Sequence, residues 1–180
     1  MKSSAGTEAR SPGTRQLPEL KRVVVVRPYG RSIRERVFRL LATASLDMRN
    51  AHILHKHTPD DEVVAFLSRS RRQYEVLLVP FHAHRDRNGA MVNGLSVLNL
   101  LARHDHSLVD CPIFMPISAM GMSSAKMMLS RDASGSGLNQ AVRRRVLFMP
   151  EDELSTPELQ RSIVAHAFGN EFGERKPDGP

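Results

Sequence analysis

The sequence predicts an α/β fold, a doubly wound five-stranded parallel sheet in the order 2-1-3-4-5 with helices on both faces. Two observations lead to this prediction. Short apolar runs alternate five times with stretches of helical periodicity. The runs show little polar alternation, as expected for parallel strands that are buried on both sides. Repeated strand–helix units with short connections then favour right-handed crossovers within one sheet.

The chain has 180 residues, of which 41% are hydrophobic and 25% charged, and this composition fits one globular domain. We expect this domain to span residues 21–168, between a disordered tail at 1–20 and a flexible tail at 169–180. The N-terminus lacks the apolar core of a secretory signal, and no apolar run approaches the about 18 residues of a membrane span. The single cysteine, Cys111, suits a reducing compartment, so we expect a cytoplasmic protein without membrane contact.

The first predicted unit is a strand of four consecutive valines at 23–26, followed by a helix. Ser32 and Glu35 match the S-x-x-E capping box, so the helix is expected to begin at Ser32. Apolar residues then recur at helical spacing on one face, at Ile33, Val37, Leu40, Leu41 and Ala44.

The second unit combines a short strand at 51–55 with a helix that ends near Arg71. Thr58 and Pro59, followed by Asp61, predict a helix start with proline at the first helical position and acids in the first turn. Beyond this unit lies the central strand of the predicted sheet.

The central strand, residues 75–80, leads into a polar loop at 81–93. Leu95, Leu98 and Leu101 then mark a third helix. Because ligands of open α/β folds usually bind at the carboxyl ends of such strands, this strand end is the first place to look for a functional site.

The last third of the chain predicts two more strands and a final helix. Its earlier elements are a strand at 112–117, a short methionine-rich helix at 124–129, a flexible loop at 132–137 and a strand at 146–149. Thr156 is expected to cap the final helix, with Pro157 at its first position and Gly169 at its end.

In this order and spacing the chain resembles a receiver domain of the bacterial two-component response-regulator family, over about residues 21–168. YEVLLVP followed by NGLSVLNLLARH resembles the third strand and third helix of a receiver. CPIFMPISA resembles its fourth strand, and VLFMPEDELSTPELQRSIVAHA its fifth strand and last helix. The resemblance implies a flavodoxin-like fold and a place in two-component signalling.

Receivers transfer a phosphoryl group to an aspartate at the end of the third strand, with further acids for Mg²⁺, a lysine and a hydroxyl. The resemblance puts the acidic pair at Arg27 and Pro28, the phosphoacceptor at Pro80, the hydroxyl at Ser118 and the lysine at Met149. Only Ser118 keeps its type, and a one-residue shift of register brings in no acid. The resemblance therefore implies a degenerate pseudo-receiver, without enzymatic activity and without a cofactor.

Without phosphorylation chemistry, the chain is expected to act by docking to a signalling or scaffold protein, or to a second copy as a homodimer. The candidate interaction surface consists of Met122, Met127, Met128, Arg143, Arg144 and Arg145. Methionine is adaptable and frequent at binding surfaces, although filling a core is its equally common role. The arginine run favours an acidic partner or phosphate, or is simply a solvated face.

The charge balance offers an alternative function. Lys and Arg outnumber Asp and Glu by 26 to 19, a net charge of +7 that favours contact with nucleic acid. With no Trp and two Tyr, the chain offers few aromatic rings to stack on bases. A third alternative is a flavodoxin-like domain that binds a small molecule at its strand ends.

Three side chains of the 81–93 loop are weak candidates for a metal site: His82, His84 and Asp86. A plain polar loop is the alternative, because the sequence offers no clear further ligand. Cys111 has no paired His or Asp at a catalytic spacing, which favours a small buried residue over a nucleophile. Ser118 lacks the G-x-S-x-G context of a nucleophilic serine and is expected to cap a helix or end a strand.

Overall fold

A single parallel sheet organises the chain, which we describe from a computed structural model over residues 20–26, 31–55, 58–82, 84–85, 91–131 and 140–172. Most of the two predicted tails therefore lies outside the described residues. The strands are β1 (Lys21–Val26), β2 (Leu46–Leu54), β3 (Val76–Leu78), β6 (Ile113–Ile117) and β7 (Val146–Pro150). Their order is β2-β1-β3-β6-β7, and every neighbouring pair is parallel. The predicted order 2-1-3-4-5 is confirmed.

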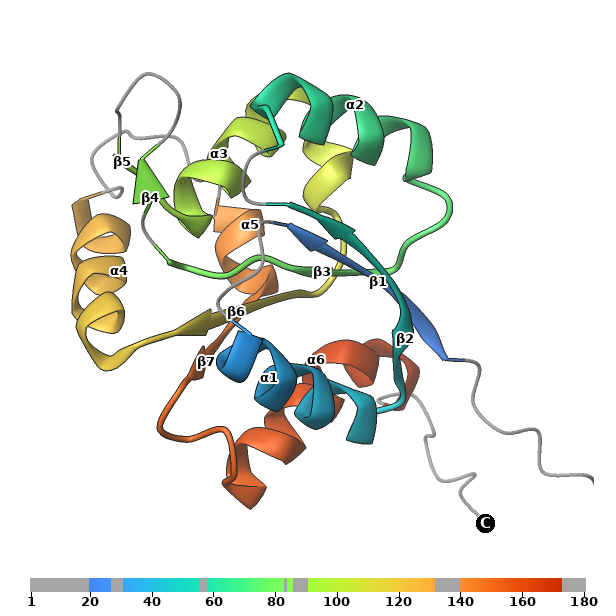
Figure 1. Cartoon of the computed structure of the whole chain (residues 1–180), viewed down its shortest axis with the longest axis vertical. Coiled ribbons are helices and arrows are strands. Elements are labelled where there is room, and N and C mark those ends of the chain that lie inside the picture. The colour runs from blue at the N-terminus through green and yellow to red at the C-terminus, as the bar shows by residue number, and fades with distance from the viewer. Residues whose placement is uncertain are drawn as a thin grey trace, which may run out of the picture.

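Helices cover both faces of this sheet, as predicted for a doubly wound flavodoxin-like fold. They are α1 (Arg31–Thr43), α2 (Asp60–Ser70), α3 (Gly94–His104), the 3-10 turn η1 (His106–Val109), α4 (Ala119–Arg131), α5 (Gln140–Arg145) and α6 (Pro157–Phe172). Helices α1 and α6 lie on one face, and α2, α3 and α5 on the other (Figure 1). Helix α4 stands beside the carboxyl ends of the strands (Figure 1). In the described part of the chain, no helix has both the length and the apolar character needed to cross a bilayer.

The valines of β1 explain why one continuous apolar run specifies a central strand. Val24 and Val26 join the core beneath α2 and α3, whereas Val23 and Val25 join the core beneath α1 and α6. None of the four is more than 3% exposed. Since side chains alternate across a strand and both faces are covered, polar alternation would place charges in one of the two cores.

The stretch between β3 and α3 is not simply the loop that the sequence predicts. Short strands β4 (His84–Arg85) and β5 (Met91–Val92) pair as an antiparallel hairpin beside the main sheet. Two-residue strands leave no periodic apolar pattern, so the sequence gives no signal for them.

The starts of the first two helices also differ from the prediction. Helix α1 begins at Arg31, so Ser32 lies within its first turn rather than at the N-cap. The Glu35 carboxylate pairs with the Arg31 guanidinium at 2.9 Å. Pro59 is the N-cap of α2 rather than its first helical residue, because its ψ of 153° is extended.

Four further elements are longer than predicted or were not predicted. The edge strand β2 begins at Leu46 because Leu46 and Met48 alternate inward at the sheet edge. Helix α4 exceeds the predicted 124–129 at both ends, and α5 was not predicted at all. Helix α6 continues past Gly169 to Phe172, since nothing in its backbone requires a left-handed stop there.

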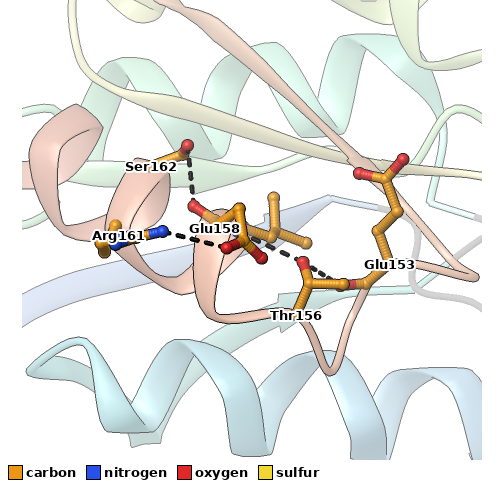
Figure 2. A network of polar contacts seen from close by, with 6 residues as sticks. Glu153, Thr156, Glu158, Arg161 and Ser162 are labelled. Carbon is orange, nitrogen blue, oxygen red and sulfur yellow. Dashed lines mark hydrogen bonds and ion pairs between the residues drawn. The ribbon is translucent and has the colours of Figure 1, made fainter.

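The start of α6 agrees with the prediction. The Leu159 backbone N–H donates to Thr156 Oγ1 at 3.3 Å, which makes Thr156 the N-cap, and Pro157 is the first helical residue. Figure 2 shows the polar contacts around this turn, including the Glu158–Arg161 ion pair at 3.0 Å. These contacts fix the entry of the helix that covers Met149.

Candidate functional site at the carboxyl edge of the sheet

The carboxyl end of β3 is closed by packing. The backbone remains hydrogen-bonded to β6 beyond Leu78, since Val79 N–H donates to Phe114 O at 2.9 Å and Phe81 N–H to Pro116 O at 3.0 Å. Pro80 is therefore held between these bonds and is buried. The position that the receiver resemblance assigns to the phosphoacceptor carries a ring without a polar side-chain atom.

The first turn of α3 presses directly on this strand end. A Cβ built on Gly94 would lie 2.5 Å from Pro80 O and 3.0 Å from Met115 Cε, so only glycine fits there. Asn93 is the N-cap of α3, and its Oδ1 accepts from Ser96 N–H at 3.1 Å. Its Nδ2 donates to Met128 Sδ at 3.3 Å, which links the start of α3 to α4.

Ser118, at the end of β6, caps α4. Its Oγ accepts from Gly121 N–H at 3.1 Å, and its carbonyl oxygen accepts from Met122 N–H at 2.8 Å. This is the capping role that the sequence favoured over a nucleophile. Gly121 packs tightly here, since an added Cβ would lie 3.0 Å from both Ile117 and Phe81 side chains.

Met149 lies opposite Pro116 in the β6–β7 register and is fully buried. Its side chain belongs to the core beneath α1 and α6, which also contains Leu154 and Ile163. The position that the resemblance assigns to the receiver lysine therefore points into an apolar core. A charged amine there would lose its hydration without gaining a partner.

A small pocket of about 260 Å³ remains at this edge. Its lining residues are Phe81, His82, Ser118, Met120, Gly121, Ser124 and Glu151. Ser124 Oγ donates to Met120 O at 3.5 Å, so the hydroxyls of both serines contact the α4 backbone. Glu151 follows β7, where its N–H donates to Ile117 O at 3.0 Å and its carbonyl accepts from Arg36 at 3.1 Å. The pocket is small for an organic ligand, since such sites usually occupy about 300–1,000 Å³.

The sequence does not single out Glu151, Gly121 or Ser124 as site residues. A signal was available for Glu151, because it directly follows the last predicted strand and the carboxyl ends of parallel strands meet at one edge. Gly121 precedes the predicted helix at 124–129, and Ser124 is its first residue. Helix α4 in fact begins at Ala119, and this earlier start brings both residues to the pocket.

The metal-site prediction gains no support from the residues that the structure describes. Among them, no three His, Cys, Asp or Glu side chains gather closely enough to hold an ion. His82 is exposed at the rim of the pocket, and His84 belongs to β4. Asp86 lies outside the described residues, as do Arg27 and Pro28 of the predicted degenerate phosphorylation pocket.

The candidate interaction surface separates into two places. Met127 and Met128 are exposed on α4, at 56% and 36%, together with Met120 at 84%. Met122 is half-buried and packs against the core rather than on this outer face. The arginine run forms α5 and leads into the amino end of β7, away from the outer face of α4 (Figure 1).

Cys111 is buried, as predicted, and burial raises the pKa of its thiol to about 12. A thiol with this pKa is almost entirely protonated at neutral pH, so it is a poor nucleophile.

Comparisons of the chain with protein-family models, with curated proteins and with solved structures find no match. The functional conclusion therefore depends on the geometry at the two ends of the strands. We call the side of the sheet where the strands end the carboxyl edge, and the side where they begin the amino edge.

Proposed function

We propose that this chain is a non-catalytic, receiver-like module that acts by docking to a partner protein or to a second copy of itself. The observation that carries the proposal is the packing at Pro80 and Met149. Both positions are buried and apolar. In the receiver resemblance they are the positions of the phosphoacceptor and the lysine.

A receiver forms an acyl phosphate, which requires a carboxylate oxygen as the nucleophile, and the transferred group requires cations to balance its charge. Pro80 offers no nucleophile, and Met149 offers no cation. Ser118 has a hydroxyl, but this hydroxyl accepts the N-terminal hydrogen bond of α4. A receiver-like fold that lacks the side chains for phosphoryl transfer favours a role for a surface of the molecule rather than for the strand-end pocket.

Helix α4 supplies the best surface for that role. Its inner side packs on the core through Met122 and Leu129, whereas Met120 and Met127 are exposed on its outer side. Isolated exposed hydrophobic residues are common, but unbranched thioethers gathered on one helix adapt well to a partner. The docking face of the proposal is therefore the outer side of α4.

Phosphorylation tests the non-catalytic part of the proposal. The full-length chain would be incubated with Mg²⁺ and acetyl phosphate and its intact mass measured. We expect no added phosphoryl group. One phosphate per chain, labile to hydroxylamine as an acyl phosphate is, would overturn the proposal.

Docking is tested by substitution on α4. Met120→Asp with Met127→Asp should abolish a specific interaction in proximity labelling in the native cell, or self-association in light scattering. Leu20→Asp is the matched control, because Leu20 is an exposed apolar residue at the start of β1, far from α4. Equal losses in both proteins, or no loss in either, would exclude α4 as the docking face.

A further inference from the structure

A second and larger pocket lies at the opposite, amino-terminal edge of the sheet. It has a volume of about 650 Å³ and is lined by four separate segments: the start of β1, the residues before β6, the end of α5 and the later turns of α6. Its volume falls within the range usual for small-molecule sites. Because four separate segments converge on it, the pocket has a defined concave shape.

Cations dominate the lining of this pocket. Lys21, Arg144 and Arg145 line it, and Asp110 is the one carboxylate among the lining residues that the structure describes. Asp110 pairs with Arg145, so these two charges largely offset each other. The described lining residues therefore carry three cations, Lys21, Arg144 and Arg145, against this one carboxylate.

Lys21 and Arg144 differ in how firmly they are held. The Lys21 ammonium donates to Ala167 O at 2.9 Å and lies 4.7 Å from the centre of the Phe168 ring. These contacts fix it at the pocket wall before any ligand arrives. Arg144 is exposed, and the described residues include no acidic partner for it. An arginine of this kind is available to bind both oxygens of a phosphate.

The surroundings strengthen the positive potential. Arg71 donates to Ser107 O at 2.6 Å and to Asp110 O at 3.1 Å, which anchors the segment that carries Asp110. Arg71 and Arg145 both oppose the burial effect that raises the pKa of Cys111. A concave surface concentrates such a potential and attracts anions.

We propose that this amino-edge pocket binds a small molecule through its phosphate group. Arg144 and Lys21 would contact the phosphate oxygens, and the apolar wall formed by Pro112 and Ala165 would cover the organic part. Extended nucleic acid fits less well, because neither aromatic ring described in the lining offers an open face for stacking bases. Phe168 is only 7% exposed, and the half-buried His166 ring packs edge-on against Phe114. The inference is independent of the proposed docking function, since it concerns the other end of the sheet.

Titration calorimetry of the full-length chain at low salt tests this site with three probes: inorganic phosphate, pyrophosphate and adenosine 5′-monophosphate. We expect saturable binding to one site, with pyrophosphate tighter than phosphate because of its greater charge. Tighter binding of the nucleotide than of phosphate would identify a phosphorylated organic ligand rather than the free anion. Arg144→Gln should weaken binding of pyrophosphate about tenfold, the effect of losing one charge-assisted hydrogen bond.

The matched control is Arg39→Gln, which removes the same charge from an exposed position on α1. This variant should bind as the wild type does. Absence of saturable binding with all three probes, or equal weakening in the two variants, would overturn the proposal. A single-stranded oligonucleotide that binds more tightly as its length increases, while the three small probes do not bind, would instead support a nucleic-acid surface.

Discussion

The carboxyl edge and the amino edge of the sheet differ in the size of their pockets and in the side chains that line them. At the carboxyl edge Pro80 and Met149 are buried, and the remaining pocket has a volume of about 260 Å³. At the amino edge the pocket has about 650 Å³ and contains Lys21, Arg144 and Arg145. Parallel α/β sheets usually carry their ligands at the carboxyl edge. Among the described residues, the larger pocket and the clustered cations lie at the other edge.

Helix direction explains part of this difference. In strand–helix units the helices run back across the sheet, so their last turns lie near the amino edge. Three helices have basic last turns, with Arg69 in α2, Arg103 in α3 and the arginine run in α5. Cations at these positions stabilise the negative end of each helix dipole. The same arrangement makes the amino edge basic, while glycines at the starts of α3 and α4 let the carboxyl edge pack closely.

The largest effect is expected for Met149→Lys, which introduces the lysine that the receiver resemblance would place at the carboxyl edge. Since Met149 is fully buried among apolar side chains, the free energy of unfolding should fall by about 3 kcal/mol or more. Urea denaturation followed by circular dichroism measures this loss.

Met149→Leu is the control, because it keeps the volume and the apolar character and should cost less than about 1.5 kcal/mol. A lysine variant as stable as the leucine variant would show that the amine reaches water at the strand end. The carboxyl edge would then accept a charged side chain, which would contradict the difference in packing between the two edges.

A smaller loss is expected for Gly94→Ala, which tests how closely α3 packs on Pro80. The new Cβ would lie 2.5 Å from Pro80 O, a backbone atom that moves only with the strand. We expect a destabilisation of about 1–3 kcal/mol in urea unfolding, as for other overpacked sites.

Gly169→Ala is the matched control at the other edge. No atom lies within 4 Å of its added Cβ, and Gly169 is inside α6, so alanine should stabilise the helix by roughly 0.5–1 kcal/mol. Opposite signs for the two substitutions would support the contrast in packing. A loss at both positions would contradict it.

The sequence predicted the sheet well because every strand except β2 carries a dense apolar run. The run of valines in β1 and the apolar residues before Pro80 specify buried parallel strands whatever surrounds them. The strand order then follows from the alternation of strands and helices. The hairpin β4–β5 and helix α5 were missed, because segments of two and six residues are too short to show a period.

The candidate site was harder to predict because it depends on which helix end meets which strand end. Arg143–Arg145 and the methionines of α4 are close in the sequence, and the prediction grouped them on one surface. The structure separates them, since α4 lies beside the carboxyl ends while α5 leads into the amino end of β7 (Figure 1). The pairing of Arg145 with Asp110 joins residues that no local pattern relates.

Ser118→Ala compares the capping serine of the carboxyl edge with an equivalent cap elsewhere. Removing Ser118 Oγ leaves Gly121 N–H without its acceptor and should cost about 1 kcal/mol. Thr156→Ala removes a similar bond to Leu159 N–H at the start of α6 (Figure 2) and should cost about the same. A much larger loss for Ser118 in urea unfolding would indicate a further role in the strand-end pocket.

His166, a half-buried histidine of the amino edge, should make the stability of the chain depend on pH. Its Nε2–H donates to Arg145 O at 2.6 Å, and its ring meets the Phe114 ring edge-on at 5.4 Å. Burial lowers the pKa of this imidazole below its usual value. The charged groups that line the same pocket are Lys21, Asp110, Arg144 and Arg145.

Because the folded chain holds His166 neutral, the unfolded chain binds the proton first as the pH falls below about 6.5. The stability should therefore decrease on acidification between about pH 6.5 and the lower pKa of the folded state, by at most about 1.4 kcal/mol per pH unit. His166→Gln keeps a side-chain N–H for Arg145 O and should flatten this part of the curve in urea unfolding from pH 7.5 to pH 5. Above pH 7 the stabilities of the two proteins should change in parallel, since neither state is protonated at this position. Parallel curves below pH 6.5 as well would show that His166 takes up a proton as readily in the folded chain as in the unfolded chain. The burial of this imidazole at the amino edge would then have no effect on its pKa.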